Sequence, residues 1–115
     1  MSVINYYDLG YAQVFIFKNY LINQIKDGVQ VNLDHVEVLR KMIQENFGER
    51  KMVYISNRNQ SYSVDPLVYP QVARIHNLVG MAIVTKTQVN KTNAEFEKMF
   101  YNKEFGVFEN LEESN

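Results

Sequence analysis

The chain has 115 residues, of which 46% are hydrophobic and 22% are charged, and this length suits one compact domain over residues 1–115. Thirteen acidic and twelve basic residues leave a net charge of −1, so the sequence lacks the basic surface that attracts nucleic acids or anionic membranes. The absence of cysteine excludes disulfides, thiolate catalysis and cysteine-ligated metals.

The N-terminal segment Met1–Tyr11 has no basic start and no long apolar stretch. We therefore expect neither a signal peptide nor stable membrane insertion, and we expect a cytoplasmic protein. Two strands are predicted next, Val14–Phe17 and Tyr20–Ile25, because both runs are rich in β-branched and aromatic residues. Lys18-Asn19 between them has the length of a tight connection, so the pair is expected to form an antiparallel hairpin.

A helix is predicted after the hairpin. Asn32 can cap its start and Gly48 can end it in a left-handed conformation. Between these two positions, apolar residues recur at helical spacing and fall on one face. They are Leu33, Val36, Leu39, Met42, Ile43 and Phe47.

Two further apolar runs, Lys51–Ser56 and Leu78–Thr85, have the pattern of strands buried on both faces. A polar loop and an apolar-striped helical segment lie between them, which is the layout of parallel strands joined by a crossover helix. Such crossovers are almost always right-handed, so the loops after the strands gather along one edge of the sheet. We expect functional residues at that edge.

Local signals place the remaining elements. Asp65 and Pro66 predict the start of the crossover helix as a tight turn, regular from Pro70, and Asn77 is expected in the left-handed position beyond its end. A capping box, in which Thr92 and a glutamate three residues later satisfy free backbone N–H groups, predicts a third helix over about 93–102. Phe105–Phe108 then predict an edge strand and 110–113 a short terminal helix, which gives five strands in all.

The element order and several local strings resemble the SpoIIAA-like fold, the group that includes STAS domains and small uncharacterised bacterial STAS/SEC14-like proteins. These strings are the opening hairpin, Lys51–Arg58, Ser63–Pro66, Asn77–Val84 and Phe105–Glu112. The resemblance implies an α/β fold: a mixed five-stranded sheet, with an N-terminal antiparallel hairpin followed by βαβ units and with helices packed mainly on one face. It also implies a binding or regulatory module in place of a catalyst.

STAS domains are switched by phosphorylation of a serine in an Asp-Ser-Ser/Thr-Gly motif at the start of the second helix. The matching region here, Gln60–Pro66, lacks that motif. Ser61 and Ser63 are the nearest candidate phosphoacceptors, and Arg58 or Arg74 could pair with a phosphate at the helix N-terminus. The alternative is that both serines only serve the turn.

The segment 57–65 is the longest polar loop and follows a central strand, a favoured ligand position in an open α/β sheet. We therefore expect this loop and the start of the following helix to contact a protein partner or a small anion. The alternative is a solvated connector. The candidate residues are Asn57, Arg58, Gln60, Ser61, Tyr62, Ser63 and Arg74.

The sequence shows no arrangement typical of an enzyme, and we expect no metal and no cofactor. His35 and His76 are far apart in the chain, and each is expected to serve a helix end instead of a metal or a catalytic step. No phosphate-binding glycine loop and no nucleophile motif is present.

Eight tyrosines and seven phenylalanines are many for a domain of this size. Most are expected in the core, and a surplus at the surface would form an apolar patch. Two alternatives stay open for such a patch: a homodimer face, and a groove for an apolar ligand such as SEC14 relatives bind. The leading expectation is a cytoplasmic, non-catalytic regulatory module that binds protein, and the alternative is a carrier of a small apolar ligand or lipid.

Overall fold

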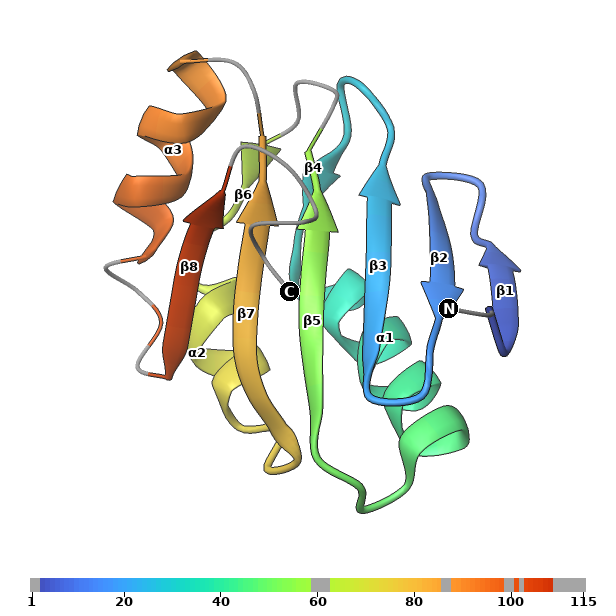
Figure 1. Cartoon of the computed structure of the whole chain (residues 1–115). Coiled ribbons are helices and arrows are strands. Elements are labelled where there is room, and N and C mark those ends of the chain that lie inside the picture. Colours follow the sequence, from blue (N-terminus) through green and yellow to red (C-terminus); the bar gives the residue numbers. More distant parts are fainter. Residues whose placement is uncertain (1–2, 59–62, 86–87, 99–100, 102, 109–115) are drawn as a thin grey trace.

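The chain forms a mixed β-sheet with two helices behind it and a third beside its outer strand (Figure 1). The computed structural model describes residues 3–58, 63–85, 88–98, 101 and 103–108. The elements are β1 (Asn5–Asp8), β2 (Ala12–Ile16), β3 (Tyr20–Ile25), β4 (Gln30–Val31), α1 (Leu33–Phe47), β5 (Met52–Asn57), β6 (Ser63–Val64), α2 (Val68–Ala73), β7 (Leu78–Val84), α3 (Gln88–Lys98) and β8 (Glu104–Phe108).

The main sheet has the strand order β1-β2-β3-β5-β7-β8. β1, β2 and β3 are antiparallel neighbours, whereas β3, β5, β7 and β8 run parallel. In the parallel part, Ile22 lies opposite Ile55, and Ile55 lies opposite Ala82. The predicted hairpin and the predicted parallel pair of central strands are therefore both confirmed.

The prediction of five strands is wrong, because the main sheet has six strands and β4 and β6 form a separate two-stranded sheet. The sixth strand is β1, where only Tyr7 is half-buried and the other residues are exposed. β1 has no buried apolar face, so its sequence has no alternation of apolar and polar residues that would predict a strand. Its strand conformation depends on pairing with β2. β4 and β6 have two residues each, too few for any periodicity to appear.

Two helix boundaries also differ from the prediction. α2 ends at Ala73, and Asp65 serves the turn before it, because the Leu67 amide donates to Asp65 Oδ1 at 3.0 Å. α3 begins at Gln88, so Thr92 lies inside the helix and is not its cap. The predicted end of this helix near 102 and the predicted terminal helix at 110–113 lie outside the described residues.

Asn77 does not take the left-handed conformation that we predicted, since no non-glycine residue among those described has a positive φ. Its buried side-chain amide instead donates to the carbonyls of Gly48 and Arg50 at 3.0 and 2.9 Å. Those carbonyls follow the end of α1. Asn77 therefore ties the start of β7 to the turn that leads into β5, a long-range contact that a local turn signal cannot reveal.

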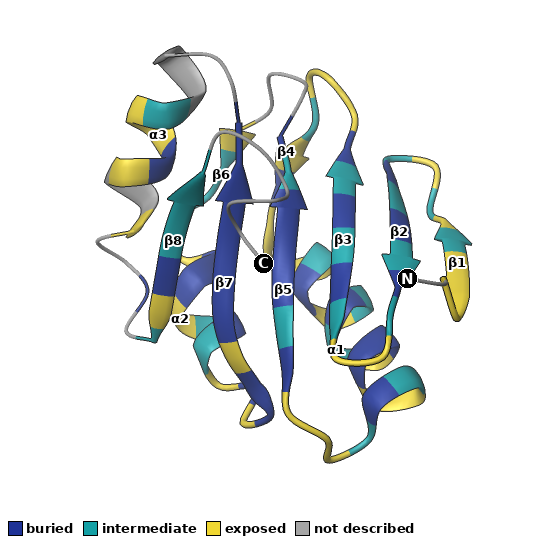
Figure 2. Cartoon of the chain, viewed as in Figure 1, coloured by how far each residue is buried: buried dark blue, intermediate teal, exposed yellow. Residues whose placement is uncertain are grey.

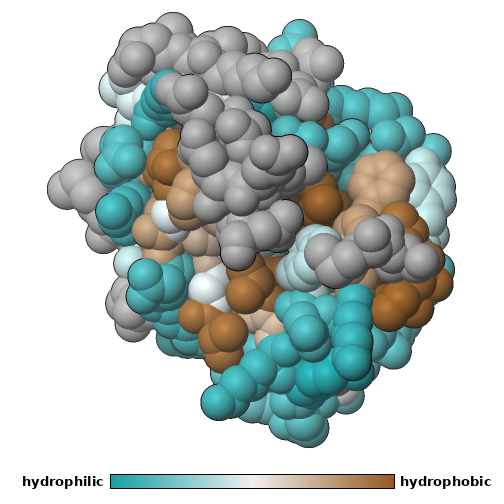
Figure 3. All heavy atoms as spheres, in the orientation of Figure 1, coloured by the Kyte–Doolittle hydropathy of each residue, from teal (hydrophilic) through white to brown (hydrophobic). Residues whose placement is uncertain are grey.

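The sheet has a different kind of surface on each side. The side facing α1 and α2 carries the large apolar core, and β5 and β7 are buried along most of their length (Figure 2). The opposite side carries a small second cluster of Ile55, Ala82 and Val84, with partly buried neighbours packed against it. Apolar side chains are visible in the middle of that face in Figure 3.

Candidate functional site

The described members of the expected 57–65 site do not gather in one place. Asn57 ends β5 and is half-buried, and Ser63 is exposed on β6, where its amide donates to Val29. Arg74 is the exposed residue directly after α2, at the opposite end of this helix from Ser63. Gln60, Ser61 and Tyr62 lie outside the described residues.

Arg58 differs most from its expected place at the surface, because its side chain is only 1% exposed. Its backbone amide donates to Val84 at the end of β7, which extends the parallel ladder by one residue. The apolar run Lys51–Ser56 predicted the strand that precedes Arg58. No feature of the neighbouring sequence indicates that the arginine side chain itself is buried. A surface contact through the loop stays a prediction for its other members.

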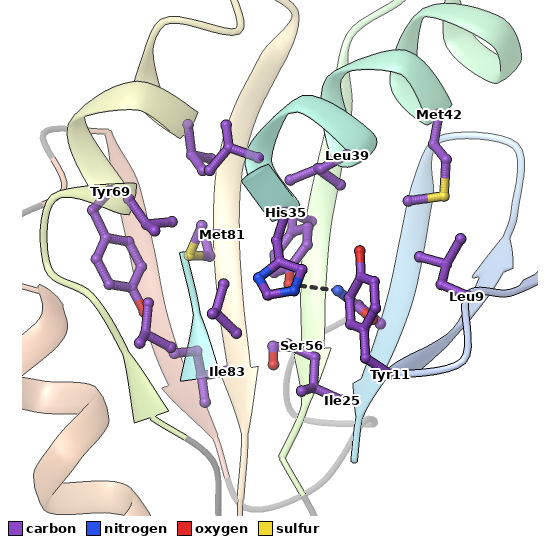
Figure 4. Close-up of a pocket in the computed structure, with 17 residues that line it drawn as sticks. Leu9, Tyr11, Ile25, His35, Leu39, Met42, Ser56, Tyr69, Met81 and Ile83 are labelled. Atoms are coloured by element: carbon purple, nitrogen blue, oxygen red, sulfur yellow. Dashed lines mark hydrogen bonds between the residues drawn. The ribbon is translucent and has the colours of Figure 1, made fainter. Parts of the chain in front are cut away.

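A pocket lies instead on the helix side of the sheet, near the carboxyl ends of β3, β5 and β7 (Figure 4). It encloses about 50 Å³, between α1, α2 and the strands. Much of its wall is aliphatic, including Ile25, Val36, Leu39, Val72 and Ile83. The arrangement follows from the crossover topology, because α1 and α2 both begin at this edge of the sheet and pack back across it.

Short elements hold the helix starts in place around the pocket. β4 and β6 pair in parallel, so that Val31 lies opposite Val64 and both line the pocket. Directly after β4, Asn32 caps α1: its side chain accepts from the Asp34 amide, and His35 Nδ1 accepts from the Asn32 amide. The expected helix-end role of His35 is thus confirmed, and this capping box fixes its ring at the pocket.

The floor of the pocket contains three buried polar side chains. Asn23 is 8% exposed and Ser56 is 2% exposed, and the two lie opposite each other in the parallel β3–β5 ladder. The Asn23 amide nitrogen donates to the hydroxyl of Tyr54 at 2.9 Å. Asn23 Oδ1 has no hydrogen-bond partner among the described residues. A buried carbonyl oxygen without a hydrogen-bond donor lowers the stability of the fold. Asn23 Oδ1 is therefore an acceptor that is available to a molecule in the pocket.

Aromatic rings form the more exposed side of the lining. Tyr11 and His35, both half-buried, pack with their ring centroids 4.4 Å apart. Burial raises the pKa of the Tyr11 phenol, so this hydroxyl stays neutral at physiological pH. Figure 4 shows the two rings side by side at the pocket.

The chemistry available in the pocket is that of apolar contact and neutral hydrogen bonds. None of its described lining residues is Asp, Glu, Lys, Arg or Cys. Across the described part of the chain, no group of three or more His, Cys, Asp or Glu side chains could hold a metal ion. His76, the second histidine, pairs with Glu49 at the exposed surface and not with a helix carbonyl.

The sequence analysis missed the polar floor, although one signal for it was present. Leu21, Asn23 and Ile25 alternate with half-buried residues along β3, so Asn23 occupies a core position of the two-residue period. A polar residue at such a position is unusual in a strand. Ser56 is harder to recognise, because β5 is buried on both faces and has no alternation to violate.

None of the helices in the described residues is long and apolar enough to cross a membrane.

No protein-family model matches this sequence, and no curated protein matches it. Among solved structures, the chain is similar to an uncharacterised protein of the DUF3478 family with a SpoIIAA-like fold, from Shewanella loihica PV-4. The TM-score is 0.62 at 13% sequence identity, over 98% of this chain and 94% of that chain. At this identity the similarity bears on the fold alone. The chain has the SpoIIAA-like fold that its sequence strings resemble.

Proposed function

We propose that the protein binds a small, uncharged molecule in the pocket between α1, α2 and the sheet. The observation that carries this proposal is Asn23 Oδ1, a buried acceptor that no described residue satisfies. An unsatisfied buried polar group costs about 1–3 kcal/mol, whereas a leucine of similar size would cost nothing of this kind. A bound molecule that completes the hydrogen bond would offset this cost.

The size of the pocket supports a small ligand. Its volume of about 50 Å³ exceeds the roughly 10–15 Å³ that a single water needs. It is far below the roughly 300–1,000 Å³ of sites for drug-sized molecules. The sequence analysis gave a carrier of a small apolar ligand or a lipid as the alternative function. The volume of the pocket favours a small ligand over a lipid.

We propose a binding role and not catalysis. In the described lining, His35 is the one histidine, and its Nδ1 already accepts a hydrogen bond from the Asn32 amide. General acid–base chemistry usually needs a second positioned group.

Titration of ¹⁵N-labelled protein with a panel of small neutral molecules tests this function by NMR. The expected result is that the Asn23 side-chain amide and the backbone amides of Ser56 and Ile83 shift together. Gln24 follows Asn23 on β3 but points to the other side of the sheet, so it serves as the internal control. Shifts at Gln24 alone, or no shifts with any member of the panel, would contradict the proposal.

Regulation through a protein partner is the second candidate function. Its support is that Asn57 ends β5 of the main sheet, at the carboxyl edge where a contact was expected, and that Ser63 is exposed on β6. A cytoplasmic location and a homodimer also remain predictions of the sequence. Replacing Ser63 by Glu would place negative charge at this edge, and a partner that binds the wild type and this variant equally would argue against a phosphorylation switch there.

A further inference from the structure

We infer that the pocket selects a neutral molecule carrying a hydroxyl or N–H group, such as a short-chain alcohol or amide, which donates a hydrogen bond to Asn23 Oδ1. This inference rests on the proposed function and names the chemical class of the ligand. Three observations lead to it. They are the direction of the Asn23 hydrogen bond, the absence of Asp, Glu, Lys and Arg from the described lining, and the position of an aliphatic wall beside Asn23 in a small pocket.

The first observation fixes which hydrogen-bonding capacity is left over. An asparagine amide offers two N–H donors and one carbonyl acceptor. Here the nitrogen donates to Tyr54 at 2.9 Å, and the oxygen has no partner among the described residues. Asn23 is only 8% exposed, so little of this residue is in contact with bulk water. A ligand donor satisfies the oxygen, whereas a ligand that only accepts leaves it unpaired.

The second observation concerns the charge of the ligand. No Asp, Glu, Lys or Arg occurs among the described lining residues, so an ionised ligand would lose its hydration without gaining a counter-charge. The Tyr11 phenol is neutral, because burial raises its pKa. Carboxylates, phosphates and ammonium ions are therefore expected to be rejected.

The third observation concerns the part of the ligand next to its donor. In the parallel ladder Asn23 lies opposite Ser56, which in turn lies opposite Ile83, so the polar floor continues into an aliphatic wall. Leu39 from α1 also lines the pocket. A volume of about 50 Å³ holds only a few non-hydrogen atoms, so the enclosed part is a hydroxyl or amide group with a short alkyl stem.

The test compares two isomers of equal composition, 1-butanol and 1-methoxypropane, with butyrate as the anionic probe. 1-Butanol donates a hydrogen bond, whereas the ether only accepts one. Each is titrated into ¹⁵N-labelled protein, and affinities are taken from the shifts of the Asn23 side-chain amide and the Ser56 and Ile83 amides. We expect 1-butanol to bind about tenfold more tightly than the ether, since one hydrogen bond to a buried group is worth this much.

Asn23→Leu and Gln24→Leu form the matched pair of variants. In Asn23→Leu the preference for 1-butanol over the ether should fall to about onefold, while Gln24→Leu should keep the tenfold ratio of the wild type. Equal binding of both isomers to the wild type, tighter binding of the ether, or preferential binding of butyrate would overturn the inference and leave the pocket as a binding site. No pocket shifts with any of the three probes would overturn the inference too. Failure of the whole neutral panel as well would reject the proposed function.

Discussion

Single polar residues in an otherwise apolar layer define what this pocket can recognise. Asn23 is the central case, because it sits between Leu21 and Ile25 on the face of β3 that the helices cover. Its nitrogen is satisfied by Tyr54 and its oxygen is not. In a core selected for stability alone, that position would favour an aliphatic side chain.

The first prediction follows from this cost. Asn23→Leu should raise the free energy of unfolding by about 1 kcal/mol, because the substitution removes an unsatisfied buried carbonyl at similar volume. Urea denaturation of the ligand-free protein measures the change, with Gln24→Leu as the control on the other face of the strand. A loss of more than about 1 kcal/mol in Asn23→Leu would mean that the Asn23–Tyr54 hydrogen bond stabilises the fold more than the orphan oxygen destabilises it.

The second prediction concerns Tyr101, which packs edge-on against Tyr69 and Phe105 and is 7% exposed. Burial raises the pKa of Tyr101 from 10.0 to about 12. A raised folded-state pKa means that its contribution to stability is complete below about pH 10 and is lost as the pH rises towards about 12. Tyr101→Phe should remove this part of the alkaline destabilisation.

Urea unfolding of wild type and Tyr101→Phe at a series of alkaline pH values measures the difference. The variant should be at least as stable as the wild type near neutral pH, since the Tyr101 hydroxyl has no partner among the described residues. Parallel pH profiles for the two proteins would contradict the assignment.

Individual elements show where backbone geometry limits the sequence. Gly80 on β7 and Gly106 on β8 both belong to parallel strands at the same side of the sheet, yet their surroundings differ. A Cβ added at Gly80 would meet its nearest atom at 3.6 Å, an ordinary contact. A Cβ added at Gly106 would lie 2.4 Å from the ring of Phe108, so the ring would have to move.

The third prediction is that Gly106→Ala destabilises the protein more than Gly80→Ala. Displacing Phe108 disturbs its packing on the cluster of Ile55, Ala82 and Val84, and overpacking of this kind costs roughly 1–3 kcal/mol. Gly80→Ala should change the free energy of unfolding by less than about 0.5 kcal/mol. Thermal unfolding of the two variants compares them directly, and equal melting temperatures would speak against the close contact.

The sequence predicts elements well where the signal is long or chemically specific. α1 was predicted from its cap at Asn32, its apolar stripe and Gly48, which has a φ of 58°. The central strands were predicted from apolar runs. β1 was missed because three of its four residues are exposed, so its pairing with β2 is a tertiary event. The start of α3 was misplaced because Thr92 and Glu95 resemble a cap that the helix does not use.

The candidate site could be predicted only in part, because it too depends on tertiary contacts that a local sequence pattern does not reveal. The carboxyl edge of the parallel strands was the expected place, and the pocket lies near it. The sequence favoured the polar loop after β5, since polarity is visible in a single sequence. A pocket depends on which side chains from β3, β5 and two helices converge, and that follows from pairing registers that no local pattern specifies.

For the molecule as a whole, the net charge is close to zero, and the described lining of the pocket has no acidic or basic side chain except the imidazole of His35. The chain carries a net charge of −1, and no Asp, Glu, Lys or Arg lines the pocket in the described residues. Long-range electrostatic steering of a ligand is therefore weak. The parallel strands β3, β5 and β7 supply the floor, and the helices that connect them supply the walls.

The fourth prediction follows from that neutrality. The affinity for 1-butanol should change by less than about twofold between low and high sodium chloride concentrations, because salt screens interactions between charges and none is expected here. NMR titration at two ionic strengths measures it. A large decrease of affinity with salt would indicate that a charged group contributes to binding.

The most direct test of the central claim is a high-resolution crystal structure of the protein soaked with 1-butanol. The account predicts density for a bound molecule in the pocket, with its hydroxyl within hydrogen-bond distance of Asn23 Oδ1 and its alkyl chain against Ile83. A pocket filled by protein side chains, or Asn23 Oδ1 satisfied by another residue of the chain, would contradict it.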